Sequence, residues 1–186
     1  MSLTAGFVSI VNTRLEINAL DGHESQALAH FSLPRPLPMR LESFIEHFLY
    51  QLSLPEEIVG YAFPIVEKFF YHISQYNIHK VVFTALALTY KFFTDLSVTN
   101  SCLEKIGLLK AGELRKLELT ILEEIDWRIE YKNIEPVIER LLEAGKIQDI
   151  QIDEIEDSEG FEDDETDFTE YGSNSSFSEL GAFFMN

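Results

Sequence analysis

The sequence has one cysteine and few basic residues, and each shortage excludes a class of protein. Cys102 has no second cysteine for an internal disulfide, and one cysteine with five scattered histidines cannot build a zinc cluster. We therefore expect a protein of a reducing compartment that holds no metal or other cofactor. With 14 Lys and Arg against 32 Asp and Glu, the net charge of −18 disfavours non-specific binding to nucleic acid or to an anionic membrane surface.

The chain also has no uninterrupted apolar run of the roughly 18 residues that a membrane helix needs. Arg14 and Glu16 stand where a signal peptide would be apolar. These observations predict a protein without a membrane span that stays inside the cell, in the cytoplasm, the nucleus or both. The two compartments stay open, because no basic cluster marks an import signal.

The patterns of an enzyme are missing from the sequence as well. No nucleophile beside a base, no phosphate-cradling glycine loop and no set of metal ligands is evident. His47, His72 and His79 occur singly on predicted helices, where the edge of a helical core is the simplest place for them. We therefore predict that the chain is not a catalyst.

Acidic residues gather at one end of the chain. Residues 147–186 contain 13 Asp or Glu and no Lys or Arg. Charge of one sign mixed with Ser, Thr and Gly does not collapse into a core, so this tail is predicted to be disordered. Its spaced aromatic residues suit docking on a basic, apolar groove, and a partner-binding tail and an inert tail both stay open. Ser158 and Thr166 precede acidic residues and are candidate sites for an acidophilic kinase.

Two patterns in residues 1–38 differ from that of a helix. In residues 11–17, apolar residues or Thr alternate with Asn, Arg and Glu, a period of two that predicts a strand. Pro34, Pro36 and Pro38 follow at alternate positions, which favours an extended connector, although they could also serve a proline-binding module. We predict an N-terminal extension over residues 1–38.

From residue 39 to residue 146 the apolar residues follow the three- and four-residue spacing of helices. Helices are predicted over about 41–52, 55–72, 78–93, 101–107, 112–127 and 136–144. Pro64 removes an amide donor from the second, so we expect a bend or break over residues 60–64. Ser101 and Glu104 have capping-box spacing, and Gly145 suits a helix end. Five or six helices around a central third one form an all-α domain.

Two opposite charges lie on apolar helix faces. The helix over 78–93 is apolar on nearly every side, which indicates burial, yet Lys91 lies near its end. Glu118 lies on the apolar stripe of the helix over 112–127. The two charges predict an ion pair. It could be a structural salt bridge, two charges that extend to solvent, or a pair at the domain edge with hydrogen-bonding capacity left for a partner.

Three segments resemble a known family: "NIHKVVFTALALTYKFFTD" (77–95), "TNSCLEKIG" (99–107) and "GELRKLELTILEEIDWRI" (112–129). They strongly resemble the cyclin box of P-type (U-type) cyclins, the group that contains the yeast phosphate-response cyclin. The match runs in order over about residues 40–130. It implies a single cyclin box of five helices around a buried third helix, which with a C-terminal helix spans residues 39–146. Leu108 and Lys110 depart from the pattern, which usually has a glycine and a Ser or Pro there.

The resemblance also implies a function. Cyclins bind a cyclin-dependent kinase and hold its C-helix in the orientation that completes the catalytic Lys–Glu ion pair. In such cyclins a Lys and a Glu of the third and fifth helices clamp the kinase segment before that helix, and Lys91 and Glu118 match them by position. We expect a heterodimer with a kinase of the phosphate-response type. Tyr90, Phe93 and Leu122 are candidate apolar contacts or supports.

Two other interpretations stay open. The chain could be a cyclin-fold adaptor that binds a regulatory or transcription protein and activates no kinase. It could also be a plain helical scaffold whose acidic tail does the binding.

Overall fold

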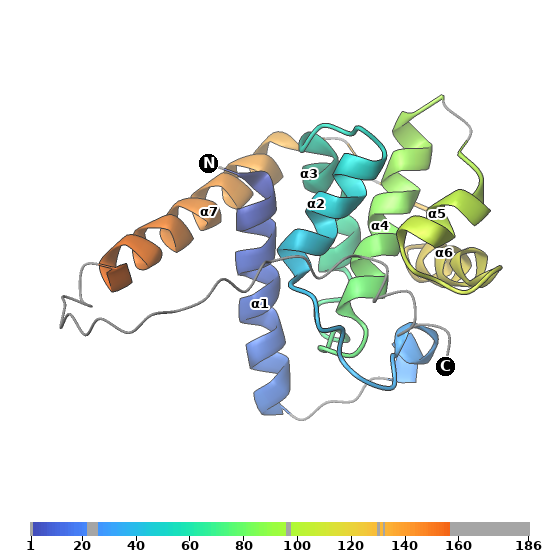
Figure 1. Ribbon diagram of the computed structural model, residues 1–186, viewed down its shortest axis with the longest axis horizontal. Coiled ribbons are helices and arrows are strands. Elements are labelled where there is room, and N and C mark those ends of the chain that lie inside the picture. Colours follow the sequence, from blue (N-terminus) through green and yellow to red (C-terminus); the bar gives the residue numbers. More distant parts are fainter. Residues whose placement is uncertain (1, 22–25, 96–97, 130, 132, 157–186) are drawn as a thin grey trace, which may run out of the picture.

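The computed structural model describes residues 2–21, 26–95, 98–129, 131 and 133–156. Within these ranges all regular secondary structure is helical, which confirms the predicted all-α fold (Figure 1). The elements are α1 (Leu3–Asp21), the short 3₁₀ helix η1 (Gln26–Phe31), α2 (Leu41–Gln51), α3 (Glu57–Glu67), α4 (Ile78–Phe93), α5 (Asn100–Ile106), α6 (Glu113–Glu124) and α7 (Glu135–Glu156). None of these helices is both long and apolar enough to cross a membrane. Ser158, Thr166 and the rest of residues 157–186 lie outside the described residues.

Helix α4 is the centre of the fold and has the predicted bounds. Every residue from Ile78 to Tyr90 is buried, as expected for a helix that is apolar on all sides. Helices α2, α3 and α6 pack around it (Figure 1). Only the last turn, which begins at Lys91, reaches solvent.

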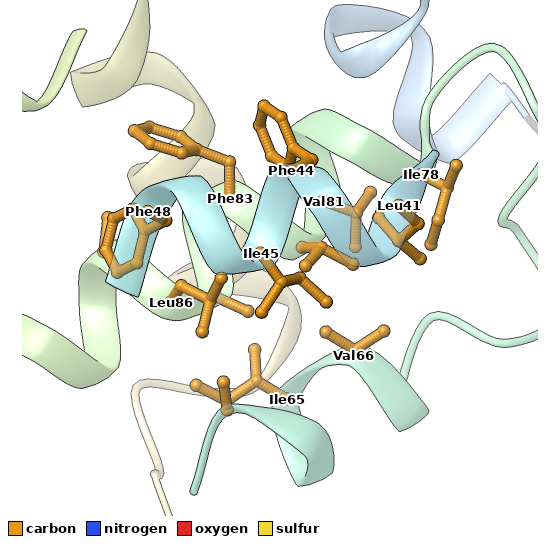
Figure 2. Packing of buried hydrophobic residues seen from close by; sticks show 14 of the residues in the cluster. Leu41, Phe44, Ile45, Phe48, Ile65, Val66, Ile78, Val81, Phe83 and Leu86 are labelled. Atoms are coloured by element: carbon orange, nitrogen blue, oxygen red, sulfur yellow. The ribbon is translucent and has the colours of Figure 1, made fainter. Parts of the chain in front are cut away.

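Apolar side chains fill the space between the central helices. Figure 2 shows Phe44, Ile45 and Phe48 from α2, Ile65 and Val66 from α3, and Val81, Phe83 and Leu86 from α4. The ring of Phe83 meets those of Phe44 and Phe48 edge-on, at centroid distances of 6.2 and 5.6 Å. A Cβ atom on Gly107 would lie 2.4 Å from the Phe83 ring. The missing side chain at Gly107 therefore lets the end of α5 close over the core.

The strand predicted over residues 11–17 is wrong, because these residues belong to helix α1. The apolar residues that precede them have helical spacing, and Leu3, Phe7, Val8 and Val11 are all buried. Phe7 packs edge-on against Phe63 of α3 at 5.4 Å between centroids. Packing of this face against α3 and α7 stabilises the helix. This stabilisation outweighs the strand preference of the alternating apolar and polar residues, which occur only in the second half of α1.

The prediction that Gly145 ends a helix is wrong. Gly145 lies inside α7, where this helix crosses α1. A Cβ atom on Gly145 would lie 3.1 Å from the Ser2 carbonyl oxygen, and one on Gly6 would lie 1.7 Å from that of Leu141. Both glycines thus permit a close approach of two backbones. Helix α7 continues over residues 147–156, the first part of the segment predicted to be disordered.

Helix α3 is shorter than predicted but shows no break at Pro64. It runs through this proline and ends at Glu67 rather than near residue 72. Single turns follow, closed by hydrogen bonds between residues three apart, such as Phe69 N–H to Val66 O at 2.9 Å. The missing amide of Pro64 removes one hydrogen bond in the helix, and the chain leaves the helix one turn later.

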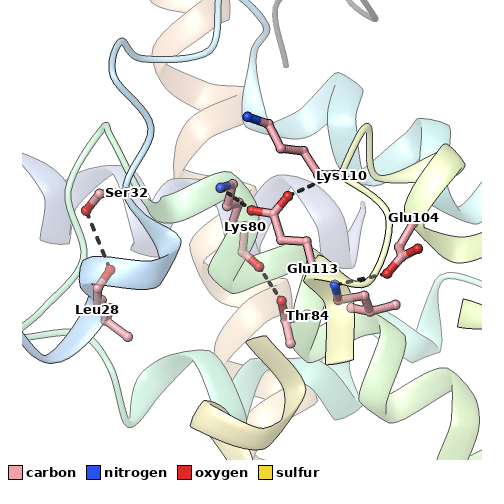
Figure 3. Close-up of polar contacts among 8 residues, drawn as sticks. Leu28, Ser32, Lys80, Thr84, Glu104, Lys110 and Glu113 are labelled. Atoms are coloured by element: carbon pink, nitrogen blue, oxygen red, sulfur yellow. Dashed lines mark hydrogen bonds and ion pairs between the residues drawn. The ribbon is translucent and has the colours of Figure 1, made fainter. Parts of the chain in front are cut away.

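The start of α5 differs from the predicted capping box of Ser101 and Glu104. Thr99 is the N-cap, and its hydroxyl oxygen accepts a hydrogen bond from Cys102 N–H at 3.3 Å. Glu104 is buried and accepts from Leu114 N–H at 3.2 Å, in the first turn of α6 (Figure 3). Glu104 therefore caps the following helix instead of its own.

The turn between α5 and α6 accommodates both departures from the cyclin pattern. Leu108 has a φ of 54°, a left-handed conformation that suits the glycine usual at this place. Gly112, with a φ of 77°, is the N-cap of α6 and supplies no side-chain cap. Lys110 N–H instead donates to Glu113 Oε2 at 2.8 Å. The carboxylate of Glu113 thus orders a turn that lacks the usual residues.

A second ion pair, which the sequence pattern did not reveal, joins the first turns of α4 and α6. Lys80 Nζ lies 2.6 Å from Glu113 Oε1, and the Lys80 side chain is almost fully buried (Figure 3). The Lys80 carbonyl also accepts from the Thr84 hydroxyl at 2.7 Å. This pair fixes the start of α6 against the start of α4.

His79, in the first turn of α4, is held neutral by its surroundings. Its Nε2 atom lies 3.0 Å from the Met39 carbonyl oxygen, so Nε2 carries the hydrogen and donates it. Nδ1 is buried and has no hydrogen-bond partner among the described residues. Burial lowers the pKa of His79, although the Met39 carbonyl opposes this shift. Protonation would therefore place an unpaired N–H group in the core.

The free energy of unfolding should fall as the pH drops below about 6.5, the pKa of an unfolded histidine. Below that pH the unfolded state binds a proton that the folded state rejects, until the pH passes the lowered pKa of folded His79. The loss is about 1.4 kcal/mol per pH unit across this window. Burial also lowers the pKa of His47, which adds to the slope in the same direction.

Denaturant unfolding between pH 7.5 and pH 5.5 measures this slope. His79→Gln should reduce it, because glutamine does not titrate in this range. A His79→Gln protein with the wild-type slope would contradict the assignment.

Candidate functional site

Lys91 and Glu118 form the predicted ion pair, at the exposed end of the crossing between α4 and α6. The distance from Lys91 Nζ to Glu118 Oε1 is 2.5 Å. The Glu118 side chain is 11% exposed and that of Lys91 is 31% exposed. Lys91 lies in the last turn of α4, where the negative end of the helix dipole favours a cation. The pair is thus desolvated on the side of the core and open on the side of solvent.

Asn100, the first residue of α5, completes the site. Its Oδ1 atom accepts from Lys91 Nζ at 2.6 Å, and its Nδ2 atom donates to Glu118 Oε2 at 3.4 Å. The side-chain amide therefore bridges both charges. Thr99 caps α5 and so directs Asn100 toward them. The role of Asn100 could not be predicted from the segment "TNSCLEKIG" alone, because the contact depends on how α5 is placed against α4 and α6.

Hydrogen-bonding capacity is left over at the site. An ammonium group has three donors, and Lys91 uses one for Asn100 and one for Glu118. Its third donor has no acceptor among the described residues. Each carboxylate oxygen of Glu118 accepts one bond and has room for a second. The site can therefore bind both a carbonyl group and an N–H group of another chain.

Exposed aromatic residues lie beside Lys91. Phe92 and Phe93 follow it directly and are 61% and 43% exposed. Their rings pack at a tilt against Tyr131, each with 4.7 Å between centroids, and Phe93 also contacts Tyr61 of α3 at 4.5 Å between centroids. Burial raises the pKa of Tyr131, whose hydroxyl donates to Thr89 at 3.4 Å. Together these rings form an apolar surface at the edge of the polar site.

Comparison with known proteins identifies the region that contains this site. Residues 57–129 match the protein-family model described as Cyclin. These residues are similar to a cyclin domain. The matched residues run from the start of α3 past the end of α6, and they include Lys91, Asn100 and Glu118.

The curated relatives that match this chain are named as U-type and P-type cyclins. The chain is 25% identical to Cyclin-U2-2 of Arabidopsis thaliana over 117 residues, which are 60% of this chain and 51% of the relative. It is 25% identical to Cyclin-P2-1 of Oryza sativa subsp. japonica over 122 residues, 63% and 56% of the two chains. Cyclin-U2-1 of Arabidopsis thaliana is 26% identical over 94 residues, 47% and 42%. The resemblance to P-type and U-type cyclins is thus confirmed, and the chain spans about half the length of the curated relatives it matches.

The three predicted apolar contact residues, Tyr90, Phe93 and Leu122, differ in how far they are buried. Tyr90 is buried and supports α4 from inside. Phe93 is available to a partner, and Leu122 is half-buried against the core beside Glu118 on α6. Phe92, the more exposed ring of the pair, was not predicted, because the sequence of a helix that is apolar all round does not show which residues of its last turn face solvent. The part of these residues in binding stays a prediction.

No group of three or more His, Cys, Asp or Glu side chains that could hold a metal ion occurs in the part of the chain that the structure describes. The candidate site offers hydrogen bonds, charge and apolar contact.

Proposed function

We propose that this chain is a regulatory subunit that binds and activates a cyclin-dependent kinase of the phosphate-response type, and that the two form a heterodimer. The observation that carries the proposal is the Lys91–Asn100–Glu118 cluster in the region similar to a cyclin domain, which pairs two charges and leaves donors and acceptors facing solvent. A cyclin is a regulatory protein rather than an enzyme. The catalytic residues would thus all belong to the kinase.

The binding surface would consist of α4, α5 and α6. Lys91 and Glu118 would bind backbone groups of the kinase segment that precedes its C-helix, in an environment where charge-assisted hydrogen bonds are strong. Phe92 and Phe93 would cover apolar side chains of the C-helix, and Leu122 would support this contact. A stable interface of this kind buries about 1,200–2,000 Å² in total.

Activation would follow from differential affinity. A kinase needs its strand Lys and C-helix Glu paired before it can transfer phosphate. A partner that binds only the inward orientation of the C-helix raises the population of that state by the difference between its two affinities. The chain would therefore act by binding, with no chemical step of its own.

Co-purification with candidate cyclin-dependent kinases of the same organism, followed by a kinase assay, tests the proposal. We expect the wild-type chain to capture and activate one kinase, and the Lys91→Ala/Glu118→Ala double variant to do neither. Glu67→Ala/Arg140→Ala is the matched control, because this exposed ion pair joins α3 and α7 away from the site. A folded wild-type chain that captures no kinase would favour the adaptor interpretation instead.

Asn100→Ala should weaken kinase binding by about tenfold, because Lys91 and Glu118 keep their ion pair but lose the amide that orients both. Its cost in folding stability should be about 1 kcal/mol. Thr99→Ala is the matched control, since loss of the N-cap costs a similar amount without removing a contact to either charge. Titration calorimetry and denaturant unfolding measure the two effects. Equal losses of affinity in both variants would show that Asn100 acts only through the stability of α5.

Two further features of the proposal concern the whole chain. We place its action inside the cell, in the cytoplasm, the nucleus or both.

The division into an extension over residues 1–38, a domain over 39–146 and a tail over 147–186 stays a prediction. Helix α1 packs against α3 and α7, and α7 runs across the boundary after residue 146.

A further inference from the structure

Three acidic side chains of α5 and α6 face inward, whereas Glu123 and Glu124 near the end of α6 are exposed. Glu104 accepts from Leu114 N–H at the start of α6, and Glu113 and Glu118 bind the two lysines of α4. Four other basic residues are exposed, and none forms an ion pair with another described residue. They are Lys105, Lys110, Arg115 and Lys116, here called the basic surface.

This surface is positive in a chain whose net charge is −18. Three of its members flank the first turn of α6, where the helix dipole adds further positive potential. Leu119 follows Arg115 by one helical turn and is exposed, so the basic surface has an apolar neighbour. The chemistry that fits is an acidic peptide with spaced aromatic residues.

Residues 157–186 of the same chain have this chemistry. They contain nine Asp or Glu, six Phe or Tyr, and no Lys or Arg. We propose that this segment docks on the basic surface of its own chain, with its carboxylates on the four basic side chains and an aromatic residue against Leu119. Phosphorylation at Ser158 or Thr166 would add negative charge and strengthen the contact.

The segment is long enough to reach the basic surface from the end of α7 at Glu156. Thirty residues span at most about 100 Å when fully extended. A compact domain of this length has a radius of gyration of about 15 Å, so the extended segment is longer than the domain is wide. A tether of this length gives an effective concentration of about 1 mM, so weak individual contacts suffice.

Cys102 provides a probe at the right place. It is the single cysteine of the chain, is exposed, and precedes Lys105 by three residues on α5. A nitroxide spin label on Cys102 of the full chain should attenuate the amide NMR signals of residues 157–186 at low salt. Because the contact is electrostatic and exposed, about 0.5 M NaCl should restore these signals.

Two charge-reversed variants make the test specific. Reversal of the basic surface to Glu at all four positions should abolish the attenuation. Reversal of the exposed Arg40, Lys68, Arg128 and Lys146 should preserve it, although the net charge changes by the same amount. Unattenuated signals in the wild type, or equal attenuation in both variants, would overturn the proposal. A mixing experiment excludes docking between two chains. A Cys102→Ser chain enriched in nitrogen-15 is mixed with a spin-labelled chain that carries no nitrogen-15. The amide signals of residues 157–186 should not be attenuated in this mixture, and attenuation would mean that the segment docks on another chain.

These NMR experiments contain no kinase, so their failure differs from a failure of the proposed function.

Discussion

Lys91→Ala and Glu118→Ala should each weaken kinase binding by about 2–4 kcal/mol, or roughly 30- to 1,000-fold. The distance of 2.5 Å between the charges and the burial of Glu118 explain the size of the effect. Either substitution leaves the other charge without its partner at a surface that the kinase would desolvate. The penalty for an unpaired buried charge then adds to the lost contact.

Titration calorimetry on the two single variants and the double variant measures the coupling between Lys91 and Glu118. The double variant should lose less affinity than the sum of the single losses, because it leaves no charge unpaired. The charge-swapped variant Lys91→Glu/Glu118→Lys separates folding from recognition. It retains an ion pair within the fold but presents the opposite polarity to the partner. Near-wild-type binding by either single variant or by the swapped variant would refute the clamp.

Gly6→Ala should lower the free energy of unfolding by about 3 kcal/mol or separate α7 from α1. A Cβ atom at this position would lie 1.7 Å from the Leu141 carbonyl oxygen and 3.1 Å from its Cα atom. These are backbone atoms, so no rotation of a side chain can relieve the overlap. The two helices must move apart, and the contact that buries Phe7 and Leu141 then weakens.

Chemical denaturation monitored by circular dichroism tests this prediction. Gly60→Ala in α3 is the matched control, since its Cβ atom would meet only the Ile138 side chain at 3.4 Å. This control should be neutral or stabilising by up to about 1 kcal/mol, because alanine favours the helix more than glycine does. A Gly6→Ala protein as stable as the Gly60→Ala protein would show that α1 and α7 do not approach this closely.

The features that follow from short-range patterns could be predicted from the sequence. Helix α4 was recognisable from its continuous apolar composition, and its bounds agree with the structure. The Lys91–Glu118 pair was recognisable because each charge interrupts an apolar face. Both signals depend on residues within one helix, where spacing alone determines which side chains share a face.

The features that depend on contacts between distant segments required the tertiary structure. Asn100 bridges Lys91 and Glu118 only because three helices converge there, and the Lys80–Glu113 pair likewise joins separate helices. Residues 11–17 alternate like a strand but are helical, because α1 buries one face against α3 and α7. The sequence by itself therefore determined the helical class, the central helix and the two charges of the candidate site. The tertiary structure decided the rest, because the burial of a face outweighs the small preferences of single residues and depends on which elements meet.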